Sequence, residues 1–217
     1  MAAMGTFAPA DPIPPARPAA TVVLARPAAP GVEVLVLRRS AGSRFVPGFV
    51  VFPGGSIDGG DRALADAWFG SEDEAPRACA VRELTEEAGL ALTARGLVER
   101  GAEAVGSEPP SIRQLPEIGR WIAPEFLAVR FDARFFAALG SDVEPRPDGV
   151  EVDLAWWARP DDVLGAQRSG EVPLAWPTLK TLEALAGCRS VEEVLALRVE
   201  QVAPPGAPSA PGREAVP

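Results

Sequence analysis

The stretch Arg82-Glu83-Leu84-Thr85-Glu86-Glu87-Ala88-Gly89-Leu90 is the most informative part of this sequence. On a helix, at about 100° per residue, its arginine and three glutamates share an arc of roughly 140° on one face. The apolar residues Ala80, Val81, Leu84 and Ala88 fall on the opposite face, which we therefore expect to be buried. Pro76 suits a first helical turn and Gly89 suits a helix end, so the sequence predicts a helix over residues 75–88.

The spacing of the three acids is unfavourable for a helix unless something binds them. Glu83, Glu86 and Glu87 stand at i, i+3 and i+4, where like charges repel, and near the C-terminal end, where the helix dipole disfavours anions. A divalent cation would offset both effects, and oxygen ligands without histidine favour Mg²⁺ or Mn²⁺ over zinc. A solvated acidic helix face, with Arg82 as an internal ion-pair partner, is the alternative that the helix alone leaves open.

The amino-acid composition further limits the kinds of catalysis and the binding partners that we expect. The chain has 217 residues, of which 47% are hydrophobic, and its 30 Asp+Glu against 21 Lys+Arg give a net charge of −9. Histidine is absent, which excludes Ser-His-Asp and Cys-His catalysis and histidine zinc sites. An acidic protein is a poor partner for nucleic acid or a membrane surface, so neither is expected. The two cysteines, Cys79 and Cys188, fit a reducing compartment, which favours a cytoplasmic location.

The chain divides into one domain and two tails. Residues 1–18 and 203–217 are rich in Ala and Pro and are interpreted as mobile tails, with a globular domain over residues 19–202. Strands and helices intermix within the domain without a regular βαβ rhythm, which favours a mixed sheet flanked by helices. Strands are predicted at 21–25, 32–37, 49–52, 126–131 and 150–157, and helices at 63–69, 75–88, 160–167, 177–186 and 191–199.

A glycine turn precedes the charged helix. The apolar run that ends in Phe52-Pro53-Gly54-Gly55 can bring its backbone close to a phosphate, because glycine carries no Cβ. This turn and the helix together resemble the two ends of a Nudix box, which reads Gly, five residues, Glu, seven residues and then Arg-Glu-U-x-Glu-Glu-x-Gly-U, with U aliphatic. Residues 82–90 match the second half at every specified position. The resemblance implies an α/β fold, a Nudix-type α/β/α sandwich with a central mixed sheet.

The first half of the box departs from the pattern. Glu74 lies at the required spacing before Arg82, whereas counting from Gly55 leads to Asp61. The two registers differ by 13 positions, which we interpret as an insertion over about residues 62–74. The roles of Asp61 and Glu74 therefore stay open. Because the insertion contains Trp68 and Phe69, we expect a short packed helix there that leaves Gly55 in contact with the glutamate helix.

A second motif lies just upstream of the glycine turn. Arg39, Ser40 and Arg44, then Gly48, then the Phe-Pro-Gly-Gly turn resemble the signature of coenzyme A diphosphatases within the Nudix superfamily. With its interrupted box, the chain is similar in particular to the acyl-CoA diphosphatase branch, which residues 120–124 and 130–136 also resemble. The guanidinium groups of Arg39 and Arg44 are suited to substrate phosphates.

The resemblance implies a hydrolase for phosphoanhydride bonds that depends on Mg²⁺ or Mn²⁺ and acts on a small-molecule diphosphate, with coenzyme A or acyl-CoA favoured. Diphosphatases for ADP-ribose, dinucleotides or nucleoside triphosphates remain alternatives, as does a Nudix-fold binding module without turnover, and a homodimer is left open. The implied catalytic residues are Glu83, Arg82 and Glu86; the implied metal ligands are Glu83, Glu86, Glu87 and the Gly55 carbonyl; the implied substrate contacts are Arg39, Arg44 and Gly54; and Glu151 is the candidate for an extra acid.

Overall fold

The structure, a computed structural model, describes residues 13–43, 46–101 and 108–204. Its strands are β1 (Arg17–Pro27), β2 (Val32–Arg39), β3 (Val50–Val51), β4 (Gly54–Ser56), β5 (Leu90–Thr93), β6 (Gly96–Glu99), β7 (Glu117–Ile122), β8 (Phe131–Leu139) and β9 (Val152–Ala158). Its α-helices are α1 (Gly59–Phe69), α2 (Ala75–Ala88), α3 (Pro160–Ser169), α4 (Trp176–Leu185) and α5 (Val191–Ala196), with 3₁₀ turns at Glu72–Glu74 and Ile112–Gln114. None of the helices within the described ranges is long and apolar enough to span a membrane.

A seven-stranded mixed sheet forms the centre of the molecule. Strand β1 pairs in parallel with β8 along nine residues, and β8 pairs in antiparallel with β7. The opposite edge of β1 pairs with β2 at Ala25–Pro27 and with β4 at Ala19–Thr21. Strand β2 continues away from β1 and pairs with β3 and β9. Because β1 and β2 separate in this way, the glycine turn lies between them, next to the middle of the sheet.

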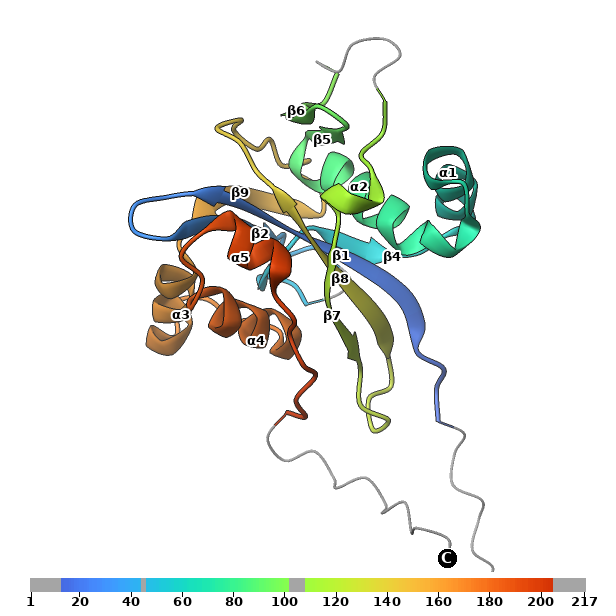
Figure 1. The fold of residues 1–217 in the computed structure, drawn as a ribbon. Helices are drawn as coiled ribbons and strands as arrows, with labels where there is room; N and C mark the ends of the chain where they lie inside the picture. The colour runs from blue at the N-terminus through green and yellow to red at the C-terminus, as the bar shows by residue number, and fades with distance from the viewer. Residues whose placement is uncertain (1–12, 44–45, 102–107, 205–217) are drawn as a thin grey trace, which may run out of the picture.

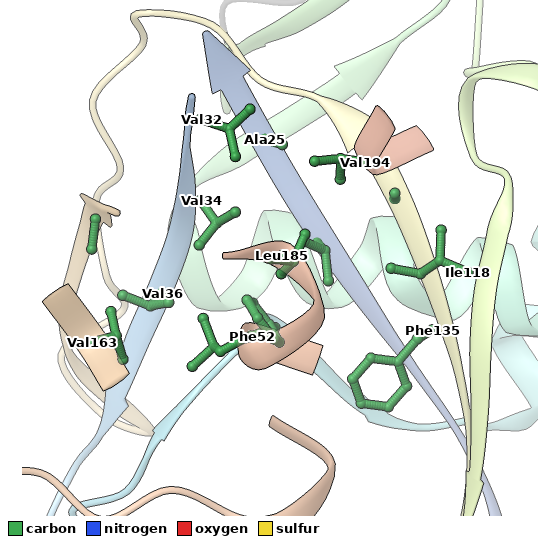
Figure 2. Close-up of a cluster of buried hydrophobic side chains, with 14 of the residues drawn as sticks. Ala25, Val32, Val34, Val36, Phe52, Ile118, Phe135, Val163, Leu185 and Val194 are labelled. Atoms are coloured by element: carbon green, nitrogen blue, oxygen red, sulfur yellow. The ribbon is translucent and has the colours of Figure 1, made fainter. Parts of the chain in front are cut away.

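Helices cover both faces of the sheet, which confirms the expected sandwich (Figure 1). The central strands alternate between the two faces, as the period of two requires. Val22 and Leu24 of β1 pack toward α2, whereas Val23 and Ala25 pack toward α4 and α5. Figure 2 shows the second of these clusters, in which Leu185 of α4 and Val194 of α5 lie against the strands.

Most predicted elements occur, with shifted bounds. Helix α2 has the predicted limits, and β1 begins at Arg17, so the last two residues assigned to the N-terminal tail belong to a strand. The strand predicted at 126–131 is wrong, because residues 123–130 form the β7–β8 loop and, of the predicted strand, only Phe131 belongs to β8. The Arg130 guanidinium donates to the carbonyl of Ala123 and closes that loop, so the apolar side chains that suggested a strand are exposed. Strands β4, β5, β6 and β7, and all of β8 beyond Phe131, were not predicted.

The insertion forms a helix, as predicted, but the helix starts earlier. Asp58 caps α1 by accepting from the N–H groups of Gly60 and Asp61, so the helix begins at Gly59. Trp68 and Phe69 form an edge-to-face pair with ring centroids 6.2 Å apart, and both pack against α2. The inserted helix is thereby fixed beside the glutamate helix.

Candidate active site

Glu87 is the most deeply buried of the three glutamates on α2, with 4% of the residue exposed. Its two carboxylate oxygens have different partners. The backbone N–H of Gly54 donates to Oε2 at 3.0 Å, and the Arg39 guanidinium donates to Oε1 at 3.1 Å. The carboxylate therefore connects the helix, the glycine turn and strand β2.

Glu83 lies one turn earlier and is packed against the second glycine of the turn. A Cβ added to Gly55 would lie 2.2 Å from Glu83 Oε1, a distance at which atoms cannot coexist. A Cβ on Gly54 would lie 2.5 Å from the carbonyl oxygen of Ala20 on β1. Gly54 thus requires glycine because the backbone of β1 approaches it, whereas a side chain at Gly55 would have to displace the Glu83 carboxylate. The predicted contact between Gly55 and the glutamate helix is confirmed.

Arg82 connects the remaining carboxylates. Its Nη1 lies 3.0 Å from Glu83 Oε1 and donates to Glu86 Oε2 at 2.8 Å. Its Nη2 donates to the carbonyl of Ser56 at 3.3 Å, just after the glycine turn. One guanidinium therefore fixes two glutamates relative to the turn.

The same guanidinium decides which acid stands in the first half of the interrupted box. Asp61, whose side chain is fully buried, accepts from Arg82 Nε at 2.8 Å and from Nη2 at 3.0 Å, a bidentate pair. Glu74 instead pairs with Arg77, whose Nε donates to the carbonyl of Leu115. The register counted from Gly55 is therefore the one that the structure assembles, and the 13 residues beyond Asp61 form the rest of α1 and the turn before α2.

Arg39 and Glu151 meet at the outer side of Glu87. The Arg39 Nη2 donates to Glu151 Oε2 at 3.1 Å, and its side chain is only 12% exposed, whereas that of Glu151 is 63% exposed. The strand-end acid chosen from the sequence is thus linked to the glutamate helix through an arginine. Asp148 supports this arrangement by accepting from the N–H of Glu151 at 3.1 Å and of Val152 at 2.9 Å. Arg44 lies outside the described residues.

Comparison with known proteins identifies this constellation. The sequence model of the NUDIX domain matches residues 15–182, a span that contains the glycine turn, α1, α2 and Glu151. The chain belongs to the Nudix family. Membership confirms the expected fold and places the chain in a family of hydrolases.

Individual Nudix relatives agree with this assignment. A Nudix hydrolase of Alicyclobacillus acidocaldarius superimposes with a TM-score of 0.72 at 33% identity, covering 85% of this chain and 98% of that one. The human acyl-coenzyme A diphosphatase NUDT19 is 27% identical over 88% of this chain and 68% of its own length. A Caenorhabditis elegans protein whose name places it among the nudix hydrolases is 28% identical over 71% of this chain, which spans 56% of that relative.

The electrostatics of this Nudix site are those of acids held in a crowded, partly desolvated place. Burial raises the pKa of Glu87 to about 8, and the N–H of Gly54 opposes this rise only in part. Burial also raises the pKa of Glu83, against the opposing effect of Arg82. Both carboxylates therefore lack sufficient positive charge nearby when they are ionised.

The donor set of the site fits a hard divalent cation. Carboxylates and a backbone carbonyl are the ligands that Mg²⁺ and Mn²⁺ prefer. The raised pKa values of Glu83 and Glu87 indicate that a further positive charge at the site would stabilise their ionised forms. In the part of the chain that the structure describes, no three acidic or cysteine side chains converge closely enough to chelate an ion. Arg82 and Arg39 instead engage the glutamates individually.

Sequence reasoning therefore selected residues that the structure brings together: the three glutamates, Arg82, the two glycines, Arg39 and Glu151. It missed the partnership of Asp61 with Arg82 and the support from Asp148. The spacing from Gly55 was the available signal for Asp61, but the competing spacing of Glu74 hid it. An Asp-Gly pair before an apolar strand, as at Asp148-Gly149, is a turn signal that could have indicated the role of Asp148.

Proposed function

We propose that this Nudix protein hydrolyses the diphosphate bond of a nucleoside diphosphate derivative with the help of Mg²⁺ or Mn²⁺, and that coenzyme A or an acyl-CoA is its substrate. The observation that carries the reaction is the contact of Glu83 and Glu87, one helical turn apart, with the Gly54-Gly55 turn. The motif from Arg39 to Gly55 and the similarity to a human acyl-coenzyme A diphosphatase support the substrate.

In this proposal the cation is held by the carboxylates of Glu83, Glu86 and Glu87 and by the carbonyl of Gly55. When bound, it would neutralise charge on the phosphoryl oxygens and make a water molecule more acidic. The residues around it set the geometry. Arg82 orients Glu83 and Glu86, and the N–H of Gly54 holds Glu87.

Proton transfer is the second task of the glutamates. We assign Glu83 as the acceptor of the water proton, because its pKa is raised toward the range in which a carboxylate is an effective base. Glu151, which is exposed at the mouth of the site, is the second candidate. A Glu151→Gln variant that abolishes the acidic limb of the pH–rate profile, or leaves it unchanged, separates the two assignments.

The reaction balances without a further reactant. The water oxygen bonds to one phosphorus, the bridging P–O bond breaks, the water proton passes to the carboxylate and the leaving phosphate takes the bond electrons. With coenzyme A, the products are phosphopantetheine and adenosine 3′,5′-bisphosphate. An acyl-CoA gives the acylated phosphopantetheine instead.

A substrate panel tests this proposal. The protein is incubated with Mg²⁺ and, separately, coenzyme A, an acyl-CoA, ADP-ribose, a dinucleotide and a nucleoside triphosphate, and the products are identified by mass. Phosphopantetheine and adenosine 3′,5′-bisphosphate are the expected products. Preferential cleavage of another compound would replace coenzyme A as the substrate, and no turnover of any diphosphate would indicate a binding module. Omission of Mg²⁺ and Mn²⁺ is expected to stop the reaction.

A further inference from the structure

A hollow of about 400 Å³ opens beside the C-terminal end of α2. Glu86 borders it from the helix, Asp148 borders it from the loop before β9, and Glu99, Arg100 and Arg146 complete its charged lining. Glu86 accepts a hydrogen bond from Arg82, and Asp148 accepts one from the backbone N–H of Glu151. The hollow therefore lies beside the acids of the candidate site at two points, at Glu86 on the helix and at Asp148, which holds the backbone of Glu151.

The end of the glutamate helix fixes the backbones of the two arginines. The N–H of Arg146 donates to the carbonyl of Ala88 at 2.7 Å, and the N–H of Arg100 donates to the carbonyl of Gly89 at 2.8 Å. Gly89 has a φ of 66°, and a Cβ there would lie 2.8 Å from the carbonyl oxygen of Arg146. Two separate segments thus meet consecutive carbonyls of one helix end, which brings both arginines to the hollow that Glu86 also lines.

The acids around the hollow have partners, whereas a guanidinium remains available. Glu86 is paired with Arg82, Glu99 lies 3.2 Å from Arg146, and Asp148 accepts backbone N–H groups. Arg100 is exposed and makes no salt bridge with any acid in the described ranges. Arg100 can therefore donate to an anion while each of these acids keeps its present partner.

We infer that this hollow is a subsite for a second anionic group of the substrate, a phosphate monoester carried on its nucleoside half. The inference rests on the proposed function, because Glu86, which borders the hollow, is one of the carboxylates that would hold the cation at the diphosphate. Guanidinium groups are suited to phosphate oxygens, which they bind through charge-assisted hydrogen bonds. In coenzyme A this group is the 3′-phosphate.

Cations near a helix C-terminus also stabilise the helix dipole, so the test must separate recognition from stability. The readout is calorimetric binding of adenosine 3′,5′-bisphosphate and of adenosine 5′-monophosphate in the presence of Mg²⁺. The proteins are wild type, Arg100→Ala, Arg146→Ala and the double variant. Arg168→Ala is the matched control, because it removes an exposed arginine from the last turn of another helix, α3.

Wild type is expected to bind the bisphosphate more tightly than the monophosphate. The double variant should lose about tenfold in affinity for the bisphosphate and keep its affinity for the monophosphate, since the contacts are charge-assisted but solvent-exposed. Arg168→Ala should bind both as wild type does. Equal binding of the two nucleotides by wild type, binding of neither, or an equal loss for both in the double variant would overturn the subsite.

Hydrolysis then separates this inference from the proposed function. With coenzyme A, the double variant should have a raised KM and an unchanged kcat, whereas KM for 3′-dephospho-coenzyme A should stay the same. A wild type that ignores coenzyme A but still prefers the bisphosphate through these arginines would refute the proposed substrate and keep the subsite. A wild type that cleaves coenzyme A with no help from them would refute the subsite alone.

Discussion

The two faces of the central sheet bury different kinds of side chain. On the face covered by α3, α4 and α5, the buried side chains are apolar apart from two threonines of α4, Thr178 and Thr181, within the described ranges (Figure 2). On the face covered by α1 and α2, the buried set includes the charged residues Asp61, Arg77 and Glu87. The same central strands contribute apolar side chains to both faces.

From this difference we infer that the proposed chemistry is located on the α2 face, whereas the opposite face mainly stabilises the fold. Buried charges cost desolvation energy, and pairing seldom returns a surplus over apolar packing. The α2 face nevertheless buries them in contact with the glycine turn, and burial raises the pKa of Glu87 to about 8. We therefore expect substitutions on the α2 face to affect turnover first, and those on the opposite face to affect stability alone.

The strongest test removes one charge from the site while keeping its shape. Glu83→Gln should lower kcat by at least about a hundredfold, comparable with the loss of a major electrostatic group in other enzymes. Its thermal transition should stay near that of wild type, because the side chain lies on the face of α2 opposite the apolar contacts of Leu84. Steady-state kinetics and circular dichroism measure the two effects. Near-normal turnover would remove Glu83 from the proposed mechanism.

Asp61→Asn tests whether the inserted helix supports the site. The change weakens the buried bidentate pair with Arg82 and leaves that guanidinium undercompensated, which should cost about 3 kcal/mol of stability. Because Arg82 also holds Glu83 and Glu86, kcat should fall by about tenfold as well.

Glu74→Gln is the matched control, since Glu74 has the competing spacing but pairs with Arg77 outside the site. It should leave kcat unchanged. If Glu74→Gln reduced kcat and Asp61→Asn did not, Glu74 and not Asp61 would be the acid of the first half of the Nudix box. The double-mutant cycle of Asp61 with Arg82 should show coupling, whereas Glu74 with Arg82 should show none.

How much the sequence predicted also differs between the regions. Helix α2 was predicted with its bounds because its cap signals, apolar stripe and charged face all agree. The strand at 126–131 was wrong because periodicity cannot show that a loop is closed by a side chain, here Arg130 on the carbonyl of Ala123. Strand β7 went unrecognised because its pattern, with Gly119 and Arg120 in the middle, is weak in isolation.

The same limit applies within the site. Local spacing was enough to group Glu83, Glu86 and Glu87 on one face, because a helix fixes their geometry. Local spacing could not choose between Asp61 and Glu74, because that choice depends on how α1 packs on α2 in three dimensions. Arg39 was selected for substrate phosphates, yet in the structure it contacts Glu87 and Glu151, a pairing between distant segments.

A pair of equal truncations sharpens the comparison of the two faces. Val194→Ala on α5 and Val81→Ala on α2 each remove two methyl groups from a buried site. Each should cost about 2 kcal/mol of stability, measured by urea denaturation. Val194→Ala should keep kcat, whereas Val81→Ala should lower it by about twofold to tenfold, because the helix that carries Glu83 can shift. Equal kcat values for the two variants would show that the faces are not separated in function.

The smallest expected effect concerns pH and the metal. In the protein without metal, the folded-state pKa of Glu87 is raised to about 8 from an unfolded value of 4.5, so between these pH values the folded state binds more protons. The contribution of Glu87 to stability therefore falls as pH rises through this window. Binding of Mg²⁺ requires the ionised carboxylate, so the stabilisation by Mg²⁺ should grow as pH approaches 8 and level off above it.

At a fixed Mg²⁺ concentration we expect the shift in Tm to be about 2–4 °C larger at pH 8 than at pH 6, which corresponds to roughly 1 kcal/mol for a protein of this size. Thermal scans with and without Mg²⁺ at both pH values measure this, and Glu87→Gln, which cannot ionise there, should show no such growth. A Mg²⁺ shift that is the same at both pH values would mean that the buried carboxylate does not contribute to metal binding, and that the charge on the α2 face has a structural role.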